Sequence, residues 1–272
     1  MAASCAPRHR SIAMGLWSTF IGVAFALSAA IAPWVMSDTG VAGLFRLHGA
    51  ALALALPVCM FILPTDGAAA GQRTGAPRPH LLLQHARIYT SFRTAVPGIC
   101  FLCYTVTAIA LLTFLPQVAG ATTHWLAVAL PVLVMAGSVS AGWLAQHRVS
   151  PLQLLAAAFG DMALAGCLLA AGLHIGIAIA PAALLLMLFA GLATGASFAL
   201  VPYLNGESAA QAQANGAIAQ PGNRGSSSGP PLFVMLLSQF GTVAIALPVV
   251  VFGLIGMLLA LRATRLQPPH AG

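Results

Sequence analysis

The sequence predicts an all-α integral membrane protein of about eight transmembrane helices, and three observations lead to that class. Of its 272 residues, 60% are hydrophobic and only 6% are charged, whereas a soluble domain carries roughly 25% charged residues. The apolar residues gather in runs of about 20, the length that spans a bilayer as a helix. The arginines between these runs fall on alternate connections, as they do in chains that cross a membrane repeatedly.

The apolar runs are rich in Leu, Ala, Val and Ile and lack the alternation of barrel strands. Backbone groups in lipid need partners within their own segment, so each run is predicted to be a helix. The first run follows basic residues as a secretory signal does, but it is much longer than the apolar core of such a signal, about 7–15 residues. We therefore interpret it as a membrane helix. The predicted helices cover residues 11–36, 43–63, 89–116, 124–145, 152–172, 177–203, 215–237 and 242–261.

Arginine placement tests this number of spans, because one span more or less would invert the side of every later loop. The opposite set of connections contains no arginine. By the positive-inside rule the arginine-bearing side faces the cytoplasm, so both termini are predicted to be cytoplasmic in a protein of the inner membrane. The arginines on this side are Arg8, Arg10, Arg73, Arg78, Arg87, Arg148, Arg262 and Arg265.

One long connection divides the chain. Residues 64–86 are rich in Gly, Pro, Ala and Arg and show no helical period of apolar residues, which is typical of a flexible linker. The predicted organisation is two helices in residues 1–63, a cytoplasmic linker in 64–88, six helices in 89–262 and a cytoplasmic tail in 263–272.

Small residues and a basic turn mark the connection between the fourth and fifth predicted helices. Gly137 and Gly142 stand on the fourth helix, where glycines allow close approach of a neighbouring helix. Arg148 follows and can bond the carbonyls at the end of that helix. We interpret Gly137, Gly142 and Arg148 as a structural loop motif.

The seventh predicted helix is unusually polar. It contains Asn215, Gln220 and Asn223, together with Pro221 and several glycines. Polar and broken helices in membranes line cavities or pack on protein, and secondary transporters bind their substrates at such helices. We expect the break at Pro221 to turn Gln220, Asn223 and Arg224 toward a central groove beside Tyr104, and Asn215 is a further candidate substrate contact.

Arg224 lies about nine residues into this predicted helix, near the centre of the bilayer. An unpaired cation there costs at least about 2.5–3.5 kcal/mol on insertion scales. Three arrangements would satisfy it: contact with an anionic substrate, bonding to helix carbonyls, or an ion pair with Asp161 on the fifth predicted helix.

The third predicted helix carries hydroxyls at mid-depth. Tyr104 and Thr105 follow Pro97 there, and a buried phenol needs a polar partner, so both are candidate substrate contacts. Most intramembrane threonines bond their own backbone instead. Cys100 and Cys103 on this helix have metal-ligand spacing but no second pair elsewhere, which favours packing over zinc binding.

Several classes of function lack support in the sequence. The chain has no Gly-x-Ser-x-Gly, His-Glu-x-x-His or P-loop motif and only one glutamate, so we expect no enzyme, no metal site and no cofactor. The net charge of +7 comes from loop arginines that orient membrane helices, so we expect no nucleic-acid partner. The expected partners are the lipid bilayer and a small solute, and the oligomeric state stays open.

Four segments resemble bacterial permeases of the major facilitator superfamily, in particular a cyanate-permease-like branch. Residues 215–225 with 229–231 are similar to the eleventh helix of that family, and residues 13–20 and 43–46 are similar to the starts of its fifth and sixth helices. Residues 137–148 resemble its cytoplasmic loop motif. In this register the chain corresponds to family helices five to twelve, with the first four absent. Pro221 and Arg224 stand where the family usually has apolar residues.

The resemblance implies a secondary active transporter that works by alternating access between two six-helix halves, each built from inverted three-helix repeats. Only the C-terminal half would be complete here. The expected solute is small, and either anionic or drug-like. The alternative is a non-transporting, truncated fragment of such a permease.

Overall fold

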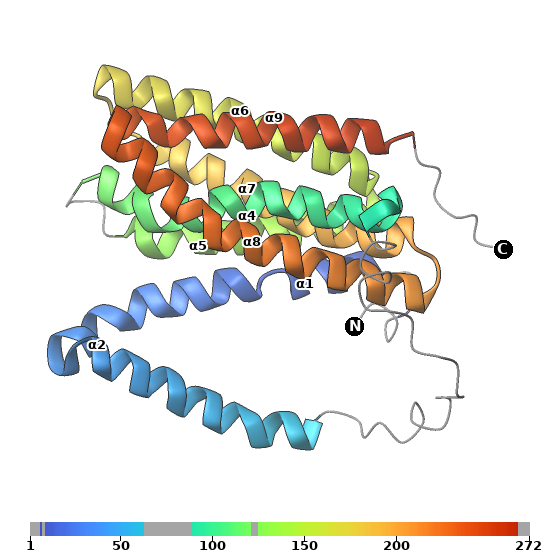
Figure 1. Cartoon of the computed structure of the whole chain (residues 1–272), viewed down its shortest axis with the longest axis horizontal. Coiled ribbons are helices and arrows are strands. Elements are labelled where there is room, and N and C mark those ends of the chain that lie inside the picture. The colour runs from blue at the N-terminus through green and yellow to red at the C-terminus, as the bar shows by residue number, and fades with distance from the viewer. Residues whose placement is uncertain (1–5, 7–8, 63–88, 121–124, 266–272) are drawn as a thin grey trace. The chain divides into compact units, whose positions relative to one another are not determined.

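The computed structural model describes residues 6, 9–62, 89–120 and 125–265, and within them every regular element is a helix (Figure 1). The all-α class is therefore confirmed. The predicted linker 64–88 and most of the predicted tail 263–272 lie outside the described residues. The helices are α1 (Arg10–Trp17), α2 (Phe20–Ile62), α4 (Phe92–Val118), α5 (Leu126–His147), α6 (Pro151–Ile175), α7 (Ala180–Leu204), α8 (Ser208–Phe240), the short 3-10 helix η5 (Thr242–Ile245) and α9 (Ala246–Ala263).

Six helical segments of the described residues are long and apolar enough to cross a membrane, against the eight runs expected. The first segment, Arg10–Ile62, has 53 residues and holds both of the first two runs. It is divided at Gly40, whose φ of 65° is non-helical and readily available only to glycine. Two of the expected spans are thus parts of one segment that bends at a glycine.

The seventh expected span is also missing from the six, because α8 is too polar rather than too short. It runs for 33 residues from Ser208 to Phe240, seven residues earlier than expected. Ala and Gln dominate its first two turns, and both are good helix formers although Gln is polar. Arg224 is consequently the middle residue of α8. The helix also continues through Pro221, so the break expected there is not present.

The chain forms two compact units. Unit 1 contains Met1–Ala26 and Ala86–Gly272, and unit 2 contains Leu27–His85. The described part of unit 2 is the rest of α2, which consists of two helical arms on either side of Gly40. Both arms are largely exposed, as expected for a segment in contact with lipid or with other helices. The boundary at residue 63 that the sequence predicts stays a prediction.

Unit 1 is a bundle whose main helix pairs are α4 with α8, α5 with α7, and α6 with both α7 and α9. Glycines bring the backbones of these pairs together. A Cβ atom at Gly229 of α8 would meet the carbonyl oxygen of Val106 in α4, and one at Gly191 of α7 would meet that of Val134 in α5. Much of the glycine content of α8 therefore serves close packing on α4.

The start of the chain packs against α5. A Cβ at Gly15 in α1 would lie 2.9 Å from the Cα of Gly142 in α5. The backbone N–H of Ser11 donates a hydrogen bond to Oε1 of Gln146 at 3.1 Å. Gly137, on another face of α5, approaches the backbone of α7 at Leu188. The close helix packing expected at these two glycines of α5 is thus present, with a different neighbour for each.

Candidate functional site

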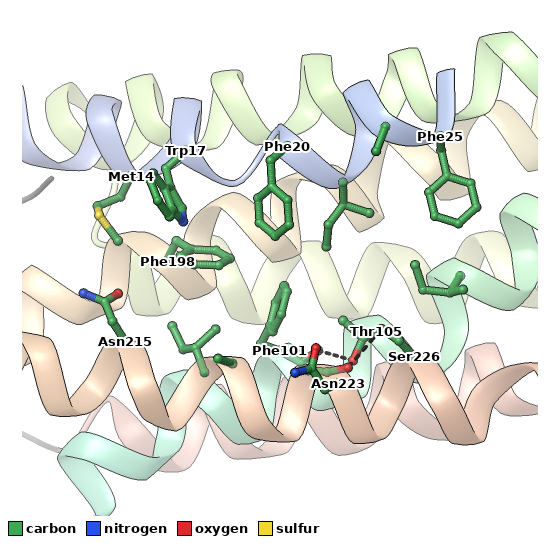
Figure 2. A pocket seen from close by; sticks show the side chains of 16 residues that line it. Met14, Trp17, Phe20, Phe25, Phe101, Thr105, Phe198, Asn215, Asn223 and Ser226 are labelled. Atoms are coloured by element: carbon green, nitrogen blue, oxygen red, sulfur yellow. Dashed lines mark hydrogen bonds between the residues drawn. The ribbon is translucent and has the colours of Figure 1, made fainter. Parts of the chain in front are cut away.

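A cavity of about 920 Å³ lies inside unit 1, between the start of the chain and helices α4, α7 and α8 (Figure 2). Its volume falls within the range of small-molecule sites, about 300–1,000 Å³. Its lining residues are Met14, Trp17, Phe20, Ile21, Ala24, Phe25, Phe101, Thr105, Ile109, Phe198, Asn215, Ile218, Ala219, Gly222, Asn223 and Ser226.

Aromatic rings form much of the cavity wall. Phe101 of α4 meets Phe198 of α7 edge to face, with ring centroids 5.1 Å apart. On its other side Phe101 stacks on Tyr104 at 5.5 Å. Figure 2 shows Trp17 and Phe20 facing these rings from the opposite side. Aromatic pairs of this kind favour flat, apolar ligands that can continue the stack.

Polar groups are few and come mainly from α8. The hydroxyl of Ser226 donates to the carbonyl of Gly222 at 3.0 Å, and that of Thr105 donates to the carbonyl of Phe101 at 3.1 Å. These hydroxyl protons are engaged within their own helices. Asn215 and Asn223 both line the cavity, and among the described residues neither amide forms a hydrogen bond. The two amides are therefore the groups that can bond a ligand.

The other expected contacts of α8 do not line the cavity. Arg224 is exposed and lies roughly half a turn around the helix from Gly222 and from Ser226, both of which line it. Gln220 is also exposed, and its Oε1 accepts a hydrogen bond from the Tyr89 hydroxyl at 3.1 Å. Of the three residues expected to share one groove, only Asn223 lines the cavity, together with the separate candidate Asn215.

The expected residues of α4 are also divided. Thr105 lines the cavity, but Tyr104 is completely buried behind Phe101, and in the described part of the chain its hydroxyl has no hydrogen-bond partner. Asp161 of α6 is half-buried and does not line the cavity. No ion pair joins it to Arg224 among the described residues. That pairing stays a prediction.

The loop motif forms no part of the cavity. Gly137 and Gly142 are packing positions, and the backbone N–H of Arg148 bonds the carbonyl of Leu144 at 2.9 Å at the end of α5. Arg148 thus caps its helix through the main chain. Cys100 and Cys103 are free and buried in α4.

The aromatic wall could not be anticipated from the sequence. Phe101 and Phe198 belong to uniformly apolar runs, in which no period separates a cavity face from a packed face. Trp17 and Phe20 lie about 80 residues before Phe101, so only the fold brings them together. The segment Trp17-Ser-Thr-Phe20, in which two large rings flank two hydroxyls, was the only local indication of this wall in the sequence.

Apolar helices around a pocket of solute size are an arrangement that secondary transporters share. A family model described as the Major Facilitator Superfamily matches residues 1–220, which is most of the chain, and the chain belongs to this superfamily of membrane transporters. The match ends within α8, so α9 lies beyond it. No curated protein matches the chain.

Proposed function

We propose that this chain carries a small, uncharged and largely aromatic or apolar solute across the inner membrane by alternating access. The observation that supports this proposal is the cavity, whose lining residues are mostly apolar or aromatic and include none with a charged side chain. Membership of the superfamily supplies the class of function. The inner-membrane location with cytoplasmic termini, and the likeness to cyanate-permease-like carriers, remain predictions.

The polar contacts of the solute would come from Asn215 and Asn223. An amide offers both a donor and an acceptor, so the two residues would orient a solute that carries a hydroxyl, carbonyl or amine. A permanent charge is disfavoured, because burying an ion among Phe101, Phe198 and Trp17 without a counter-charge costs several kcal/mol. Among the solutes expected from the sequence, the drug-like class fits this cavity better than the anionic class.

Transport can be tested with two dyes of the same skeleton, the neutral phenylnaphthylamine and the sulfonated anilinonaphthalene sulfonate. Membrane vesicles that contain the full chain and are energised by respiration should move the neutral dye faster than vesicles without the chain. Ala219→Trp would place an indole ring inside the cavity, against its aromatic wall, and should strongly reduce this movement. Ala212→Trp is the matched control, because Ala212 is exposed one heptad earlier on α8 and does not line the cavity.

Two results would contradict the proposal. One is energised transport of the neutral dye at the parental rate by a well-inserted Ala219→Trp variant. The other is movement of the sulfonated dye in place of the neutral one. Arg224→Leu addresses the anionic alternative separately. Because Arg224 is exposed away from the cavity lining, this variant should keep transport of the neutral dye. A loss of uptake in Arg224→Leu that Arg224→Lys partly restores would favour an anion contact instead.

A further inference from the structure

A second, smaller cavity of about 420 Å³ lies where four helix ends of unit 1 meet. The ends are the start of α1, the end of α5, the start of α6 and the end of α7. It is far from Asn223 in the sequence and shares no lining residue with the aromatic cavity. Its lining residues are Arg10, Ser11, Ala145, Gln146, His147, Arg148, Val149, Ser150, Pro151, Pro202 and Tyr203.

The charged side chains that line this cavity are all positive. Arg10 and Arg148 bring two guanidinium groups to it, and no acidic side chain is among its lining residues. Neither arginine forms an ion pair within the described part of the chain. Two cations gathered without a counter-charge repel each other, and the arrangement becomes favourable when an anion binds between them.

The guanidinium group of Arg10 has a donor without an acceptor. Its Nε atom is buried and makes no hydrogen bond within the described residues. A guanidinium N–H can only donate, and a buried donor without an acceptor costs about as much as a lost hydrogen bond. Oε1 of Gln146, which also lines the cavity, bonds the Ser11 backbone N–H at 3.1 Å and not Nε of Arg10. An oxyanion entering the cavity would supply the missing acceptor.

Of the polar side chains beside the two arginines, His147 and Ser150 are already bonded within the chain. His147 places Nδ1 at 3.0 Å from the carbonyl oxygen of Trp143, which can only accept, so Nδ1 carries the proton. Tyr203 adds a phenol at the end of α7. The hydroxyl oxygen of Ser150 accepts a hydrogen bond from the backbone N–H of Gln153 and so caps the start of α6. The cavity therefore combines two planar cationic forks with a phenol, which suits a phosphate group.

The position of the cavity indicates where such a phosphate comes from. It lies at helix ends, where the exposed Val149 lines it and the exposed ring of Trp143 lies 5.3 Å from the ring of the lining residue His147. Trp is enriched at the level of lipid headgroups. The same end of the bundle carries Arg10 and Arg148, which the positive-inside rule directs to the cytoplasmic leaflet, where anionic lipids attract basic residues.

We propose that this basic cavity binds the phosphate of an anionic phospholipid, with Arg10 and Arg148 as its two main ligands. Trp143 and Val149 would contact the start of the acyl chains. The bound lipid would join α1 to the α5–α6 connection and to the end of α7. This site does not depend on the solute that the aromatic cavity takes.

The test uses the purified full chain in a neutral detergent and measures the midpoint of thermal unfolding. Short-chain phosphatidylglycerol, phosphatidylcholine with the same chains, and inorganic phosphate are the three probes. Phosphatidylglycerol should raise the midpoint saturably, by about 5 °C at a hundredfold excess over its dissociation constant. Phosphatidylcholine should give a much smaller shift, because its headgroup carries no net charge.

Substitutions assign that shift to the cavity. In Arg10→Gln/Arg148→Gln the phosphatidylglycerol titration should move to about tenfold higher lipid, since two charge-assisted hydrogen-bonding groups are lost. Arg262→Gln/Arg265→Gln is the matched control, because it removes two exposed arginines from the end of α9, on the same side of the bundle but outside the cavity. The control should titrate like the parent. If the first double variant does not fold, Arg148→Gln alone should give an intermediate titration.

Three results would overturn the proposal. The first is an equal shift with phosphatidylcholine, which would remove the anion specificity. The second is the same titration in the two double variants. The third is a full shift with inorganic phosphate alone, which would make free phosphate rather than a lipid the ligand.

Discussion

The two cavities of unit 1 are built from overlapping sets of helices but differ in chemistry. The aromatic cavity lies between the start of the chain and helices α4, α7 and α8 and has no charged lining residue, whereas the basic cavity lies at helix ends and has two arginines. The difference follows from solvent. Charge is costly at mid-depth and inexpensive near the headgroups, so binding in the middle relies on ring contacts and amides.

The position of Arg224 also shows how charge is kept out of the aromatic cavity. It is the middle residue of α8, at the same level as cavity residues Asn223 and Ser226, yet the rotation of the helix directs it away from them. The helix thus keeps its cation out of the aromatic cavity while presenting two amides to it. Its side chain is exposed, and no residue that the structure describes forms an ion pair with it.

The largest expected effect is at Phe101, the ring shared by both aromatic contacts of the wall. Phe101→Ala should weaken binding of phenylnaphthylamine by at least about tenfold and lower the free energy of unfolding by about 3 kcal/mol, because it removes a buried ring and leaves a void. Fluorescence titration and thermal unfolding measure the two effects. Phe240→Ala is the control, because it removes an exposed ring at the end of α8, and it should change neither one appreciably.

The second prediction is that a change in the basic cavity does not affect binding in the aromatic cavity. Arg10→Gln/Arg148→Gln should weaken phosphatidylglycerol binding about tenfold and leave the affinity for phenylnaphthylamine unchanged, because the cavities share no lining residue. Paired titrations on the same preparation measure this. A parallel loss of dye binding would mean that the two cavities are coupled and cannot be treated as separate sites.

A smaller effect is expected at the amides. Asn223→Leu should weaken binding of dyes that carry a hydrogen-bonding group by about fivefold, the equivalent of one hydrogen bond of about 1 kcal/mol. It should leave purely aromatic dyes without such a group unaffected or bound slightly better. Gln220→Leu is the control, since Gln220 does not line the cavity. Equal losses for both kinds of dye would show that Asn223 acts through packing.

The smallest expected effect is that of salt, which should weaken binding in the basic cavity but not in the aromatic cavity. Raising the salt from 0.1 to 1 M shortens the Debye length from about 10 to about 3 Å. Phosphatidylglycerol binding at Arg10 and Arg148 should weaken severalfold, while binding of the neutral dye should stay the same or tighten slightly. A dye affinity that falls in parallel would indicate a charged contact in the aromatic cavity.

The sequence predicted the helical class and most helix positions, because apolar runs of the right length have few other solutions in a membrane. Five of the predicted helices, from α4 to α7 and the last one, agree with the structure within about four residues at each end, the usual uncertainty of boundaries. The errors concern a helix that begins with polar residues and a long helical segment that bends. Residues 208–214 are helical but polar, and Gly40 bends one long segment that reads as two separate runs.

The candidate site was predicted less well, for a physical reason. Thr105, Asn215 and Asn223 line the cavity, in keeping with the tendency of polar residues in a membrane segment to avoid lipid, and their contact with a substrate stays a prediction. Arg224 and Gln220 were expected there by the same argument, but polarity alone does not tell which side of α8 faces the cavity. The rotation of α8 is set by Gly225 and Gly229 against α4, and only packing reveals it.

The most direct test of this account measures binding inside the aromatic cavity itself. The sequence has four tryptophans, and Trp34→Phe/Trp125→Phe/Trp143→Phe leaves only Trp17, which lines the cavity. Energy transfer from Trp17 to phenylnaphthylamine should then be saturable, should be lost when unlabelled naphthalene competes for the cavity, and should be absent for the sulfonated dye. Non-saturable transfer that unlabelled naphthalene does not displace would show that the dye merely dissolves in the detergent around the protein, and would contradict the account.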